Sequence, residues 1–209
     1  MRRHPPPAAQ RAGPLRPPLP VIHLLTEGRL TEVEYFTNWG RELRAHVRVT
    51  IDDFHGTPAR LVDRAVMLQT ERKKAIQRGR DARFDATWCV FDQDDHPGVD
   101  AAIALARQHD IGIAHSNPCF ELWLSLHGTS VTRNTDRGEI QRQAQSNRFT
   151  AAKRLHDDAW PRLMATWADA QSRANELDRR HKGNGSPANS NPSTTVGHLV
   201  ASLLDMRKG

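Results

Sequence analysis

The sequence predicts an α/β protein with a mostly parallel sheet, helices on both of its faces, and a C-terminal helical segment. Short apolar runs alternate with segments of helical periodicity from about residue 21 to residue 127. Strands alternating with helices in this way form parallel sheets that are covered on both sides. The chain has 209 residues, which is long enough for one domain with a sizeable core.

The first part of the chain supplies four predicted strands and four predicted helices. Thr31 with Glu34 is a capping-box pattern that begins one helix, and Thr57 before Pro58 begins another. The apolar runs predict strands at residues 21–25, 46–51, 86–91 and 111–114, and the helical patterns cover residues 31–43, 57–78, 99–109 and 118–127.

The second part of the chain is more polar. After Gly128 we expect an irregular stretch to about residue 147, then helical segments at residues 150–160 and 161–181, and a last short helix at residues 193–206. Residues 1–19 are rich in proline and arginine and predict a disordered basic arm. The expected organisation is therefore an arm at 1–19, an α/β core at 20–130 and a helical extension at 131–209 that packs on the core.

Composition narrows the class of protein. Prolines interrupt the basic start where a signal peptide needs an apolar stretch, and no apolar run approaches the roughly 20 residues of a membrane span. The two cysteines, Cys89 and Cys119, lie in separate apolar runs, which is typical of a reducing cytoplasm. We therefore expect a cytoplasmic protein without membrane contact. Its net charge of +6 favours a polyanionic partner, although many soluble proteins are mildly basic.

Acidic residues follow two of the predicted strands. Glu27 ends the first strand, Glu32 lies one turn into the next helix, and Asp92 and Asp94 end the third strand on the same side of the chain. Ligands of parallel α/β sheets bind beyond the carboxyl ends of the strands. Carboxylates gathered there would repel one another unless they held a hard cation, so the pattern predicts a site for Mg²⁺ or Mn²⁺. The alternative is a pair of solvated turns.

Four ordered blocks, at residues 27–36, 91–96, 116–127 and 191–196, give the chain a family resemblance. Together they resemble the RloB-like family over about residues 21–205, and the run SNPCFELW at residues 116–123 is the most distinctive piece. The resemblance implies a TOPRIM-like fold and a role in bacterial defence against phage, in which relatives often work beside an ABC-type ATPase. TOPRIM nucleases of the related OLD type use two glutamates, an Asp-x-Asp pair, a later glutamate and a lysine. Carried over by motif and order, these are Glu27, Glu32, Asp92, Asp94, Glu121 and Lys153.

Three functions follow, in order of preference. The first is a magnesium-dependent endonuclease that cuts DNA or RNA, including tRNA, as a defence effector. The second is a non-catalytic nucleic-acid-binding or regulatory subunit of an ATPase complex, and the third is phosphoryl transfer on a small molecule with Ser116 as an added group. Glu121, placed between Phe120 and Leu122, could be satisfied either by a metal or by a buried arginine. Whether the chain forms a homo-oligomer stays open.

Overall fold

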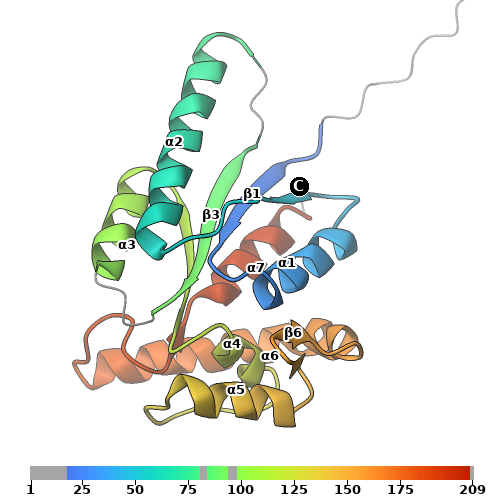
Figure 1. Cartoon of the computed structure of the whole chain (residues 1–209), viewed down its shortest axis with the longest axis vertical. Helices are drawn as coiled ribbons and strands as arrows, with labels where there is room; N and C mark the ends of the chain where they lie inside the picture. The colour runs from blue at the N-terminus through green and yellow to red at the C-terminus, as the bar shows by residue number, and fades with distance from the viewer. Residues whose placement is uncertain (1–17, 81–83, 94–97, 208–209) are drawn as a thin grey trace, which may run out of the picture.

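The computed structural model describes residues 18–80, 84–93 and 98–207 (Figure 1). Its centre is a five-stranded sheet in the order β2-β1-β3-β4-β7, and the first four strands are parallel while β7 is antiparallel to β4. The strands are β1 (Val21–Thr26), β2 (Arg48–Ile51), β3 (Ala86–Asp92), β4 (Gly112–Asn117) and β7 (Ser193–Thr194). The predicted mostly parallel sheet is confirmed.

Helices cover both faces of this sheet, as the alternating pattern predicted. One face carries α2 (Pro58–Gln77) and α3 (Val99–Gln108), and the other carries α1 (Thr31–Glu42) and the C-terminal helix α7 (Val196–Asp205) (Figure 1). A further layer lies beyond the carboxyl ends of β1 and β3 (Figure 1). It contains α4 (Glu121–Leu126), α5 (Arg137–Ser146), α6 (Ala159–Gly183) and a hairpin of β5 (Thr150–Ala151) and β6 (Arg154–Leu155).

The strands alternate their side chains between two separate buried clusters, because successive residues of a strand point to opposite faces. Leu24 of β1 joins the cluster of α1, α4, α6 and α7, whereas Leu25 joins the cluster of α2 and α3. The first cluster is aromatic, and within it the indole N–H of Trp123 donates a hydrogen bond of 2.7 Å to the hydroxyl of Tyr35. This bond ties α4 to α1 in the interior.

Three predictions for the second part of the chain are wrong. The stretch expected to be irregular contains α5, which Asp136 begins by accepting a hydrogen bond of 2.9 Å from the backbone N–H of Glu139. The segment expected to be helical at residues 150–160 forms the β5–β6 hairpin instead. Its two-residue turn places Ala152 at φ 46° and Lys153 at φ 66°, as a type I′ turn requires. The segment expected to begin the last helix starts with β7, and the helix follows at Val196.

Two further features bear on the sequence predictions. Pro161 lies in the first turn of α6, where its missing N–H costs no helical hydrogen bond, so one helix replaces the expected break.

Within the described ranges, no helix has both the length and the apolar character that a bilayer span requires. The division of the chain at residue 130 stays a prediction. The predicted arm falls almost entirely outside the described residues.

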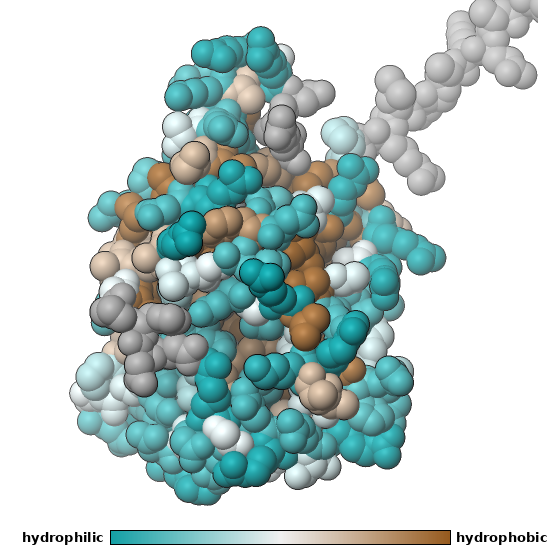
Figure 2. Space-filling view, in the orientation of Figure 1, coloured by the Kyte–Doolittle hydropathy of each residue, from teal (hydrophilic) through white to brown (hydrophobic). Residues whose placement is uncertain are grey.

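Figure 2 shows that hydrophilic side chains cover most of the face in view, including the far end of α2. Hydrophobic side chains gather in the upper middle of that face, where the sheet is least covered by helices.

Candidate functional site

The candidate site lies where the order of the strands reverses. The chain passes from β1 outward to β2 and then returns to β3 on the other side of β1, so the carboxyl ends of β1 and β3 border a topological switch point. Glu27 follows β1, and its backbone N–H donates a 2.9 Å hydrogen bond to the carbonyl of Val90. Its carboxylate accepts a 3.1 Å hydrogen bond from the backbone N–H of Asp92. The first and third strands thus bring their terminal acids together, as predicted.

Glu32 lies against the backbone of Gly28. A Cβ atom at residue 28 would lie 2.0 Å from Oε2 of Glu32, so a side chain there would displace the carboxylate. Glu32 is buried, and the backbone N–H groups of Gly28 and of Glu32 itself act to lower the pKa of its carboxyl, against the larger effect of burial. The glycine after Glu27 therefore makes room for the second acid.

Four carboxylates line one cavity of about 280 Å³. Glu121 is the first residue of α4, is 9% exposed and lines this cavity. The acid within the apolar SNPCFELW run therefore faces the cavity and not the core alone. The other three are Glu27, Glu32 and Asp92. The remaining predicted acid, Asp94, lies outside the described residues.

The electrostatics of the cavity show a shortage of positive charge. Burial is the main cause that raises the pKa of Glu32 to about 7, and the nearby charges of Glu121 and Glu27 contribute to this rise. Burial also raises the pKa of Asp92 well above its usual range, with Glu32 as the largest of the acidic neighbours that add to this and Arg137 opposing it. A cation bound here would relieve the repulsion.

Arg137 is a site residue that the sequence analysis missed. Its Nη2 donates a 2.8 Å hydrogen bond to Oδ2 of Asp92, and it lines the cavity together with Gln141 one turn further along α5. The spacing of Asp136 and Glu139 before the apolar Ile140 is a helix-start signal that could have placed Arg137 at the beginning of a helix. Nothing in the sequence connects it to Asp92, 45 residues away.

Lys153 lines the same cavity, although it lies on a hairpin turn and not on the predicted helix. The hairpin is fixed to the first turn of α1. Thr31 donates a 2.7 Å hydrogen bond from its hydroxyl to the carbonyl of Lys153. Glu34 accepts hydrogen bonds from Nε of Arg154 at 2.6 Å and from the backbone N–H of Leu155 at 2.8 Å. Thr31 and Glu34, expected to cap the helix, thus hold the hairpin instead.

The oxygen donors suit a hard divalent cation of the magnesium type. Mg²⁺ in proteins is commonly held by one or two carboxylates, with water and phosphate oxygens completing its coordination. Within the described residues, no group of three or more His, Cys, Asp or Glu side chains is arranged to hold a metal ion. One or two of Glu27, Glu32, Asp92 and Glu121 are the carboxylates that could take part in holding such a cation.

Ser116 and His115 lie next to the site without lining this cavity. The hydroxyl of Ser116 is buried and lies 2.9 Å from that of Thr194 on β7, so it ties two strands together. Nε2 of His115 lies 2.6 Å from Oε1 of Gln93, and burial lowers the pKa of this histidine to about 4. His96, the other histidine near the strand ends, lies outside the described residues.

The fold and the cavity define a class of protein. It is an α/β protein with a cavity at the switch point of its parallel strands, lined by four carboxylates and by the basic side chains of Arg137 and Lys153. The family model for RloB-like proteins matches residues 22–203, and the chain belongs to the RloB-like family. No curated protein and no solved structure matches the chain.

Proposed function

We propose that this protein is a TOPRIM-type endonuclease that uses Mg²⁺ or Mn²⁺ to cleave phosphodiesters in DNA or RNA, tRNA included. The observation that carries the proposal is the set of four carboxylates and two basic side chains around one cavity at the switch point. The role as an effector of defence against phage, beside an ABC-type ATPase, rests on the family resemblance alone.

The mixture of charges explains why an acidic cavity would suit an acidic substrate. Carboxylates alone would repel a phosphodiester, but carboxylates that share a divalent cation attract it. Such a cation, when bound, would polarise the phosphodiester and lower the pKa of an attacking water. Arg137 and Lys153 add positive charge at the cavity wall, where it stabilises the negative charge that grows on the phosphate oxygens.

The chain's own groups have separable roles in this proposal. Glu27 is held by the backbone of β3 and is therefore a well-positioned metal ligand, with Asp92 beside it. Glu32, with a pKa of about 7, exchanges a proton near neutral pH and so adapts its charge to what the cavity holds. The hairpin keeps Lys153 next to α1 through Thr31.

The test is cleavage of total tRNA and of plasmid DNA in MgCl₂ or MnCl₂, with and without an ABC-type ATPase of the kind that the family resemblance implies as a partner. We expect a Glu27→Gln/Asp92→Asn variant to lose at least about 100-fold in rate, because both acids are metal ligands in the proposal. A Glu71→Gln/Asp100→Asn variant changes the same residue types on α2 and α3 and serves as the matched control. Equal cleavage by the two variants would remove the nuclease proposal.

A second candidate function is a non-catalytic nucleic-acid-binding or regulatory subunit of an ATPase-containing defence complex. The ion pair between Arg137 and Asp92 favours it, because this pair engages one of the acids that catalysis needs. Salt-sensitive binding of nucleic acid, with no metal-dependent turnover in the presence of the ATPase, would support this function.

A further inference from the structure

Two recesses lie in the layer of α4, α5 and α6, separate from the carboxylate cavity. One has a volume of about 400 Å³ and is completed by α6, and the other has about 450 Å³ and is completed by α5. Both are lined by Ser130, Val131 and Thr132, so this short loop is their common wall. We call the two recesses together the arginine groove.

The groove is strongly basic. Five arginines line it against two glutamates, Glu139 and Glu176, and Glu139 forms an ion pair with one of the five. The groove therefore has an excess of three positive charges, which is half of the net charge of +6 of the whole chain. The five are Arg133, Arg142, Arg173, Arg179 and Arg180.

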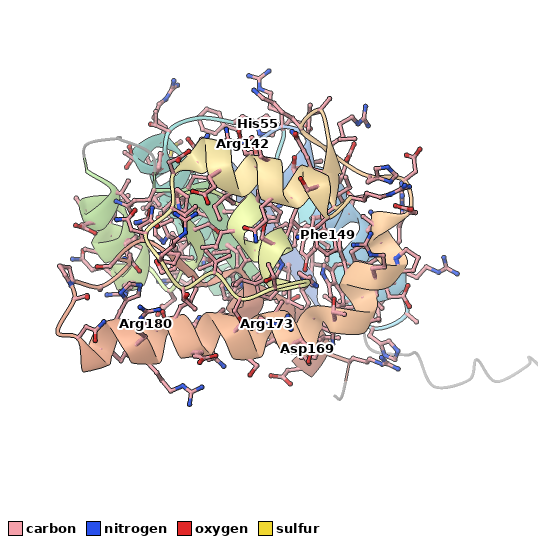
Figure 3. All side chains as sticks on the ribbon, turned by 90° about the horizontal axis from the view of Figure 1, so that it is seen from below. His55, Arg142, Phe149, Asp169, Arg173 and Arg180 are labelled. Atoms are coloured by element: carbon pink, nitrogen blue, oxygen red, sulfur yellow. The ribbon has the colours of Figure 1, made fainter. Side chains whose placement is uncertain are left out.

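Two of these arginines also hold the fold together. Arg173 donates from Nη1 to the carbonyl of Leu126 at the end of α4, and Arg180 donates from Nη1 to the carbonyl of Thr132. A guanidinium has five N–H donors, so one such bond orients the group and leaves other donors for a ligand. Figure 3 shows Arg173 and Arg180 spaced along α6, with Arg142 on α5 above them in that view.

Of the other three arginines, Arg133 forms the ion pair with Glu139, and in the described part of the chain two have no such role. Arg142 and Arg179 are exposed, and within the described residues Arg142 has no ion-pair partner. Ser130, Thr132 and Gln143 add hydroxyl and amide groups of the kind that hydrogen-bond phosphate oxygens.

We propose that the arginine groove binds the sugar-phosphate backbone of a nucleic acid strand. The proposal rests on the proposed nuclease function in that the same strand supplies the phosphodiester for the carboxylate cavity. Helix α5 joins the two places: Arg137 and Gln141 line the cavity, while Arg142 and Gln143 line the groove. The two sites thus share α5 as a wall, and adjacent parts of one strand could reach both across this helix.

The test is fluorescence anisotropy with labelled 30-nucleotide oligo-dT, oligo-U and a mixed-sequence duplex, titrated with the full chain at several KCl concentrations without divalent cations. An Arg133→Gln/Arg142→Gln/Arg179→Gln variant is expected to bind at least about tenfold more weakly. The slope of log K against log[KCl] should fall by about 2, because three phosphate contacts to a single strand are lost. The matched control is Arg44→Gln/Arg78→Gln/Arg107→Gln, which removes the same charge from exposed positions outside the groove.

The outcomes separate this proposal from the nuclease. If the groove variant binds as tightly as the control variant, the groove proposal is overturned, whether or not the protein cleaves. If the groove variant alone loses affinity while the Arg44→Gln/Arg78→Gln/Arg107→Gln control binds like wild type, the groove is supported. That support would stand even if no preparation shows metal-dependent cleavage, a result that would remove only the nuclease.

Discussion

The two faces of the sheet differ in how much they contribute beyond covering it. The α2 and α3 face is packed mainly by aliphatic side chains such as Leu61 and Val62. The other face holds an aromatic cluster around Tyr35 and Trp123, whose helices α1 and α4 also carry Glu32 and Glu121. One face therefore stabilises the sheet, whereas the other stabilises the sheet and positions two acids of the candidate site. Truncating a buried side chain should therefore lower the stability on either face, but should disturb the candidate site only on the aromatic face.

The largest expected effect comes from Trp123→Ala. Removing this fully buried indole and its bond to Tyr35 should lower the free energy of unfolding by about 3–5 kcal/mol. The proposed cation site predicts that MnCl₂ raises the melting temperature of the wild type. Because α4 loses its anchor to α1 in this variant, the variant should lose that rise.

Leu61→Ala on the opposite face is the matched comparison. It should lower the free energy of unfolding by about 2–5 kcal/mol and yet keep the MnCl₂ effect, because Leu61 packs in the α2 and α3 cluster and does not line the cavity of the four acids. Thermal unfolding with and without MnCl₂ measures both quantities. A loss of the MnCl₂ effect in both variants would show that the two faces do not differ in this way.

A smaller effect is expected from the charge of Glu32. In the folded protein its pKa is about 7 against an ordinary 4.5, so between these values the folded state binds a proton that the unfolded state releases. The stability of the metal-free protein therefore falls as the pH rises through this window, by about 3 kcal/mol in total.

Glu32→Gln removes this dependence. The metal-free variant should be more stable than wild type at pH 8, by up to about 3 kcal/mol, and about equally stable at pH 4. Urea unfolding across this pH range checks it, with the exposed Glu71→Gln as control. A variant that is less stable than wild type at pH 8 would show that the Glu32 carboxylate is stabilising as a charge.

The smallest effect concerns the hairpin on α1. Glu34→Gln weakens the bonds to Arg154 and Leu155, and we expect local opening of the hairpin to become easier by about 1 kcal/mol, since Glu34 is partly exposed. Amide hydrogen exchange at Leu155 should then be about fivefold faster. Exchange in α2 should not change, and Glu42→Gln at the other end of α1 is the control. Unchanged exchange at Leu155 would mean that other contacts hold the hairpin.

How far the sequence could predict the structure depends on how local the signals are. The ends of β1 and β3 were predictable because each strand is a short apolar run followed directly by its acid, here Glu27 and Asp92. Glu121 was placed by order alone, and the structure brings it to the same cavity as the other two.

The second part of the chain lacked such signals. The turn at Ala152 and Lys153 adopts positive φ with residues that normally avoid it, so no glycine or asparagine announced a hairpin. Its contacts to Thr31 and Glu34 span 120 residues or more, and the pairing of Arg137 with Asp92 spans 45. Interactions of this range decide the local structure there, and a single sequence does not show them.

The antiparallel strand β7 has a consequence for the order in which the protein can be completed during synthesis. It pairs with β4 through contacts such as Ser116 with Thr194, which are 78 residues apart in the chain. At ordinary translation rates of about 5–20 residues per second, the outer edge of β4 stays open for several seconds after it leaves the ribosome. An open strand edge is a template for pairing with other chains, so nascent molecules are most prone to aggregation in that interval. Slowing translation of residues 118–192 should therefore lower the soluble yield more than slowing it after residue 194.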